Sequence, residues 1–78
     1  MMDDKSLLIL LTVRNTAHFG ELSPSVKDLQ KATLLSSGGV QFKINDLVDG
    51  GYITRKRLAR SIKITEKGEK ILKQNGLI

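Results

Sequence analysis

The residues best able to bind a ligand are five cations that lie close together in the second half of the chain. They are Arg55, Lys56, Arg57, Arg60 and Lys63, and no acidic residue occurs between Asp49 and Glu66. Lysine and arginine contact phosphate groups and position a protein on a phosphate backbone without specifying a base sequence. The run therefore indicates an anion-binding surface, and a solvated turn is the alternative.

Two short β-type patterns flank these cations. Tyr52, Ile53 and Thr54 precede them, and Ile62 and Ile64 then alternate with polar residues. Alternation of this kind is typical of a strand with one apolar face and one polar face. We expect a two-stranded hairpin whose basic side meets solvent or phosphate.

Capping residues predict helices on both sides of the hairpin. Asp3 or Asp4 begins a helix that ends near residue 17, and residues 19–24 break it. Ser25, with Asp28 three residues later, resembles a capping box and begins a second helix that ends near Thr33. Its apolar side is predicted to carry Val26, Leu29 and Ala32. Thr65 begins a last helix over residues 66–75, which Gly76 closes.

The third helix is predicted between Ser36 or Ser37 and the Gly50-Gly51 pair. One stripe carries Val40, Ile44, Leu47 and Val48. The opposite face carries Gly38, Gly39, Gln41, Phe42, Lys43 and Asn45. Two helices joined by a short turn, the second with a polar outer face, match a helix-turn-helix.

Composition limits the function classes. The 78 residues, here assigned to one domain (1–78), carry a net charge of +5. Residues 1–49 hold five basic and six acidic residues (−1), whereas residues 50–78 hold eight and two (+6), so the charge is localised. The absence of cysteine and the single His18 argue against disulfides, metal sites and catalytic sets, so no cofactor and no enzyme activity are expected. The longest apolar run is too short for a bilayer span, which predicts a cytoplasmic, nucleoid-associated protein without membrane contact.

Several segments resemble known regulators of transcription. SPSVKDL (residues 23–29), LSSGGV (35–40), LVDGGYI (47–53) and RSI (60–62) resemble the DNA-binding domain of LexA-type repressors. LSSGG (35–39) and ITEKG (64–68) are also similar to MarR-type regulators. Both resemblances imply an α+β winged helix-turn-helix with three helices, a two-stranded basic wing and a fourth helix. The chain lacks the cleavage site and protease domain of LexA, and the longer wing and long flanking helices of MarR proteins.

Carried onto this sequence, the resemblance implies a site for double-stranded DNA. Its members would be Ser36, Ser37, Gly38, Gly39, Gln41, Phe42, Lys43, Asn45, Arg55, Lys56, Arg57, Arg60 and Lys63. The helix near 37–49 would enter the major groove, and the 55–61 wing would contact the backbone or minor groove. Gly38 and Gly39 are either a poor helix start or a point of close approach to phosphate. Phe42 has three interpretations: a thymine contact, a subunit contact, or packing over the second helix.

The first helix raises the question of oligomerisation. Leu7, Leu8, Ile9, Leu10 and Leu11 cover its whole circumference, which is more than one buried stripe needs. A homodimer through the first and last helices, with Ile71, Leu72, Leu77 and Ile78, would bury the apolar side chains that the core does not need. The alternative is that the fourth helix of the same chain covers them.

The leading function is a small transcriptional regulator, more readily a repressor than an activator. There are two alternatives: a protein–protein assembly module, and a DNA-binding factor in replication or in viral or plasmid maintenance. The sequence does not show whether the protein binds a small-molecule effector.

Overall fold

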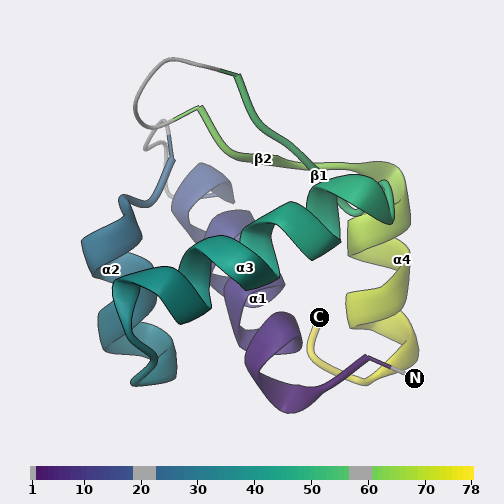
Figure 1. Ribbon diagram of the computed structural model, residues 1–78. Coiled ribbons are helices and arrows are strands. Elements are labelled where there is room, and N and C mark those ends of the chain that lie inside the picture. The colour runs from purple at the N-terminus through teal and green to yellow at the C-terminus, as the bar shows by residue number, and fades with distance from the viewer. Residues whose placement is uncertain (1, 19–22, 57–60) are drawn as a thin grey trace.

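The computed structural model describes residues 2–18, 23–56 and 61–78. Three helices come first, followed by a two-stranded hairpin and a fourth helix (Figure 1). The elements are α1 (Asp4–His18), α2 (Val26–Thr33), α3 (Ser37–Asp49), β1 (Ile53–Thr54), β2 (Lys63–Ile64) and α4 (Glu66–Gln74). This order confirms the predicted α+β arrangement.

Side-chain caps start the helices where the sequence predicted them. Asp3 accepts a hydrogen bond from the Ser6 amide at 3.2 Å and so caps α1. Ser25 and Asp28 form a full capping box at the start of α2, with bonds of 3.0 and 3.1 Å. Ser36, and not Ser37, caps α3 by accepting from the Gly39 amide at 3.1 Å. These bonds satisfy amide groups that the first turn of a helix leaves unpaired.

The turn between α2 and α3 is made by a strained residue. Leu34 ends α2 in the left-handed conformation, with φ 62°, and its amide donates to the Gln30 carbonyl at 2.7 Å. Glycine is the usual residue for this conformation because a Cβ atom disfavours it. The Leu34 side chain is 86% exposed, so side-chain packing does not explain why a leucine occupies this position.

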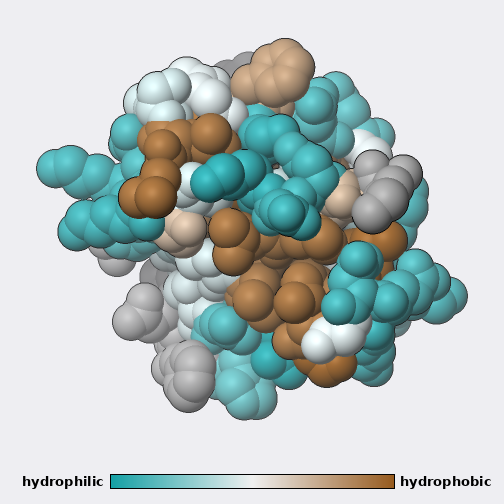
Figure 2. Space-filling view, turned by 90° about the horizontal axis from the view of Figure 1, so that it is seen from below, coloured by the Kyte–Doolittle hydropathy of each residue, from teal (hydrophilic) through white to brown (hydrophobic). Residues whose placement is uncertain are grey.

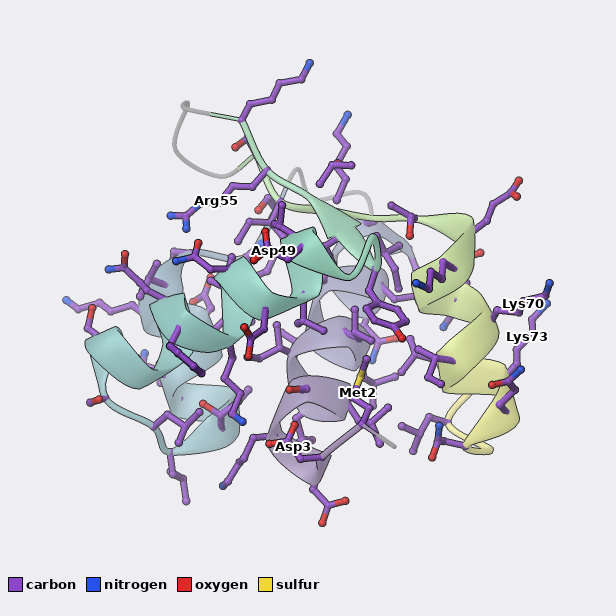
Figure 3. The ribbon with its side chains drawn as sticks, turned by 45° about the vertical axis from the view of Figure 1, so that its right-hand side comes forward. Met2, Asp3, Asp49, Arg55, Lys70 and Lys73 are labelled. Atoms are coloured by element: carbon purple, nitrogen blue, oxygen red, sulfur yellow. The ribbon has the colours of Figure 1, made fainter. Side chains whose placement is uncertain are left out.

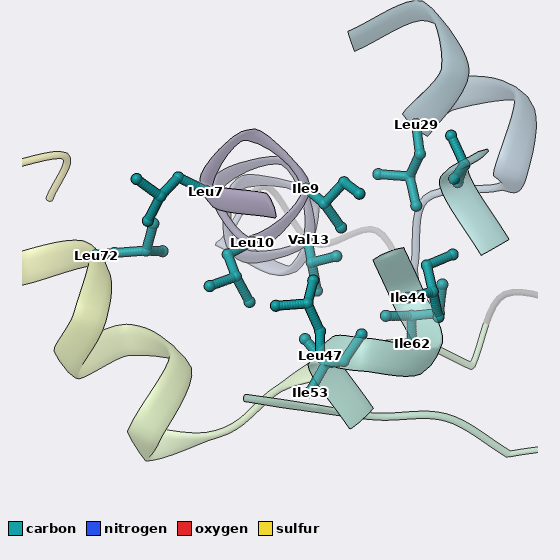
Figure 4. Close-up of a cluster of buried hydrophobic side chains, with 11 residues drawn as sticks. Leu7, Ile9, Leu10, Val13, Leu29, Ile44, Leu47, Ile53, Ile62 and Leu72 are labelled. Carbon is teal, nitrogen blue, oxygen red and sulfur yellow. The ribbon is translucent and has the colours of Figure 1, made fainter. Parts of the chain in front are cut away.

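The core gathers around α1, which runs through the middle of the fold (Figure 4). Its members are Leu7, Ile9, Leu10, Val13, Leu29, Val40, Ile44, Leu47, Ile53, Ile62 and Leu72. Two predicted core positions were wrong: Val48 and Ala32 are exposed. Val48 lies at the edge of the α3 stripe, and Ala32 lies on the side of α2 that faces away from α1 and α3. Because Leu72 is fully buried inside one chain, its predicted role in a dimer surface is also wrong.

The hairpin is held at its base by α4 and, on the loop side of β2, by the segment before α2. The strands pair antiparallel, with Ile53 opposite Ile64 and Thr54 opposite Lys63. The buried Ser23 hydroxyl accepts from the Ile62 amide at 3.1 Å, which joins the start of the helix-turn-helix to the hairpin. Gly68 lets α4 approach closely, since an added Cβ would lie 2.7 Å from Ile64 Cγ1 and closer still to the Tyr52 carbonyl oxygen.

Candidate nucleic-acid interface

The described cations of the hairpin all reach solvent. Arg55, Lys56 and Lys63 are exposed, whereas Ile62 and Ile53 are buried beneath them. The predicted alternation of the second strand is therefore confirmed. Arg55 projects outward from the hairpin, on the side of the molecule opposite to Lys70 and Lys73 of α4 (Figure 3). Two predicted site residues, Arg57 and Arg60, lie outside the described residues.

Ser61 closes the hairpin next to these cations, a role that the sequence analysis missed. Its hydroxyl accepts from the Lys56 amide at 3.0 Å and donates to the Lys56 carbonyl at 2.8 Å. The strand register, continued by two residues, places Lys56 opposite Ser61, where two backbone bonds would be expected. One hydroxyl takes the place of both and ties Lys56 to the opposite side of the hairpin. A serine within a basic run was the only sequence signal for this role.

The start of α3 presents open backbone. Ser36, Ser37 and Gly38 are exposed, and a Cβ added to Gly38 would have nothing within 4 Å. Gly39 differs, because its added Cβ would lie 3.3 Å from the Ser36 Oγ atom and 3.5 Å from Leu35. Close packing against Ser36 and Leu35 therefore explains the glycine at position 39. Gly38 has no such neighbour and leaves room for a ligand at the positive end of the helix dipole.

The outer face of α3 carries three exposed side chains of different chemistry: Gln41, Phe42 and Asn45. Gln41 makes a long bond of 3.5 Å to Ser37, so its amide is available to other partners. Phe42 is 66% exposed. Of its three interpretations, this exposure argues against packing over the second helix and leaves the thymine contact and the subunit contact. Amide side chains of this kind read adenine edges in the major groove, and an apolar side chain contacts the thymine methyl.

Lys43 does not belong to this face. It is half-buried and forms an ion pair with Asp3 at the start of α1. The hydrogen bonds from Lys43 and Ser6 lower the pKa of Asp3 from 3.8 to about 2. The predicted contact of Lys43 with DNA is corrected accordingly: the side chain points toward α1 and holds α3 against it.

Acidic side chains occupy the other end of α3. Asp46 and Asp49 are exposed in its last turn, where the negative end of the dipole disfavours them. Lys67 of α4 places a positive charge at this negative end of the helix. Its ammonium donates to the Gly50 carbonyl at 2.6 Å and lies 4.6 Å from the centre of the Tyr52 ring. Lys67 is therefore a structural cation, and the negative charge of α3 is confined to its second half.

The face opposite the hairpin carries an apolar patch surrounded by hydrophilic side chains (Figure 2). A groove of about 370 Å³ lies between α1 and the C-terminal residues, and it is lined by Asp4, Leu7, Leu8, Leu11, Asn75 and Leu77. Leu8 and Leu77, which line the groove, are 37% and 41% exposed, and Ile78, the last residue, is 36% exposed. Of the five apolar side chains at positions 7–11 of α1, only the exposed Leu8 and the half-buried Leu11 therefore remain outside the core.

The part of the chain that the structure describes contains no group of three or more His, Cys, Asp and Glu side chains that could hold a metal. Across residues 2–18, 23–56 and 61–78, no helix has the length and apolar character that crossing a membrane requires.

The architecture matches a solved structure. The crystal structure of AF1382 from Archaeoglobus fulgidus superposes with a TM-score of 0.80 over 97% of this chain and 85% of that chain, at 20% sequence identity. No family model matches the sequence, and no curated protein is similar to it at a significant level. A likeness at this identity establishes the fold, so the chain has a winged-helix-like arrangement of three helices, a two-stranded hairpin and a fourth helix.

Proposed function

We propose that this chain binds double-stranded DNA, with the first half of α3 in the major groove and the hairpin on the backbone or minor groove. The observation that carries the proposal is the hairpin itself, where Arg55, Lys56 and Lys63 are exposed and no described acid lies among them. A phosphate backbone is the polyanion that such a basic projection fits.

The distribution of charge on α3 supports one orientation. Its first turns carry no acid, and Gly38 leaves the amide end of the helix open. Asp46 and Asp49 follow in the last turn, where they would repel phosphates. Recognition helices commonly contact base edges through their N-terminal residues, so the proposed contacts come from Ser36, Ser37, Gly38, Gln41, Phe42 and Asn45.

A protein that binds DNA in this way acts by occupying a DNA site. The leading interpretation is therefore a small transcriptional regulator, and a repressor is the simpler kind because it only has to occupy the site. Replication or plasmid maintenance would use the same surface. We further propose that two copies associate through the apolar groove, whose lining includes the exposed Leu8 and Leu77. That face lies opposite the hairpin (Figures 1 and 2), so a symmetric dimer would leave both α3 helices free for DNA.

The proposal is tested by selecting bound sequences from a random duplex library and measuring their affinity by fluorescence anisotropy across a salt series. Three phosphate contacts from the described cations alone predict a slope of about −3 for log K against log salt. A flat salt dependence, or no binding at low salt, would contradict the proposal and favour a protein-assembly role for the apolar face.

A further inference from the structure

Phe42 is a large apolar side chain that the fold leaves uncovered. It is 66% exposed and lies on the outer face of α3, one turn after Gly38. In a helix, long side chains lean toward the N-terminus and cover the preceding turn. No atom lies within 4 Å of a Cβ added at Gly38, so the surface one turn before Phe42 is open.

The surroundings of Phe42 are polar. Gln41 and Asn45 are its exposed neighbours on the outer face. Of the acids in the last turn, Asp46 lies four residues and about 6 Å farther along the axis, and Asp49 lies seven residues and about 10 Å farther along. Phe42 thus stands between two amide side chains, in the half of the helix that carries no negative charge.

The other exposed large apolar side chains come from different parts of the fold. Leu8 and Leu77 line the groove beside α1, Ile78 is the last residue, and Leu34 lies in the turn between α2 and α3, eight residues before Phe42. Val48 follows Phe42 by six residues, which places it about 120° away around the helix. A protein interface has a contiguous apolar centre with several anchors, whereas one phenyl ring among amides fits a much smaller apolar group.

We propose that Phe42 packs against the C5-methyl group of a thymine and so makes an A·T pair part of the bound sequence. This inference rests on the proposed DNA binding. The thymine methyl is the apolar group that base pairs expose in the major groove, and apolar side chains contact it. Gly38 gives the duplex the space to reach the ring, and the amides of Gln41 and Asn45 lie where they can bond to adjacent bases.

The test uses the whole chain and a duplex chosen by selection from a random library. Each thymine is replaced in turn by deoxyuridine, which removes only the methyl group, and the Kd is measured for wild type, Phe42→Leu and Phe42→Ala. For wild type, we expect one or two replacements to weaken binding about three- to tenfold, as loss of one buried apolar group would. Phe42→Leu should keep part of this sensitivity, and Phe42→Ala should lose it.

The outcomes separate this inference from the proposed function. If no selected duplex binds wild type, DNA binding itself fails. If wild type binds DNA but Phe42→Ala shows the same losses with deoxyuridine, the thymine contact is refuted while DNA binding stands. If Phe42→Ala binds DNA as wild type does but changes the sedimentation of the protein, Phe42 is a protein contact and the inference is overturned. The thermal midpoint of Phe42→Ala should stay near that of wild type, because the ring is exposed.

Discussion

Replacing Gly68 with alanine should destabilise the domain, although alanine is the better helix former. The new methyl group would lie 2.7 Å from Ile64 Cγ1 and closer to the Tyr52 carbonyl oxygen. That carbonyl accepts from the Thr65 amide at 3.1 Å, so it cannot move away without loosening the junction of hairpin and α4. Overpacking costs about 1–3 kcal/mol, and helix propensity returns about 1 kcal/mol.

Because the contact involves backbone, we expect a net loss of about 2 kcal/mol. In a domain of this size that lowers the midpoint of thermal unfolding by about 8–16 °C, measured by circular dichroism. Gly38→Ala is the matched control: nothing lies within 4 Å of its added Cβ, so it should gain up to about 1 kcal/mol. A Gly68→Ala protein as stable as wild type would refute the close packing of α4 on the hairpin.

Four further predictions concern caps, strain and the two surfaces. Asp3→Asn should lower stability by less than about 1 kcal/mol at neutral pH, since Asp3 is half exposed. The folded pKa of Asp3 lies below 3.8, so its contribution is complete above pH 3.8 and declines as pH falls toward about 2; urea titrations of both proteins should converge there. Leu34→Gly should stabilise by about 1 kcal/mol in thermal unfolding, because it relieves the left-handed leucine. Ser61→Ala removes both bonds that hold Lys56, and it should weaken DNA binding about fivefold, as a loss of about 1 kcal/mol would. Ser61→Thr, which keeps the hydroxyl, should restore binding. Leu8→Glu should shift sedimentation toward monomer, and unchanged sedimentation would argue against the dimer.

The helix starts could be predicted because they depend on neighbouring residues. Ser25, Ser36 and Thr65 each precede a helix and cap it through a bond to an amide three residues later. The stop at Gly50-Gly51 is equally local, since Gly51 adopts a positive φ of 80°. The hairpin followed from the alternation of apolar and polar residues.

The direction of individual side chains could not be predicted, because it depends on elements far apart in the sequence. Lys43 has the spacing of an outer-face residue, yet it forms an ion pair with Asp3, forty residues away. Lys67 was counted with the basic half, but it stabilises the end of α3 through Gly50. The sequence assigns no role to Gly68, because its close packing depends on the Tyr52 carbonyl, which is sixteen residues away.

The measurement that tests the central claim most directly compares two variants of equal net charge. Arg55→Ala/Lys56→Ala removes two cations from the hairpin, and Lys70→Ala/Lys73→Ala removes two from α4, on the opposite side of the molecule (Figure 3). We predict that the hairpin variant loses at least tenfold in affinity for duplex DNA and lowers the salt slope by about 2. The α4 variant should bind within twofold of wild type. Equal losses in the two variants would contradict a DNA site built on the hairpin and α3.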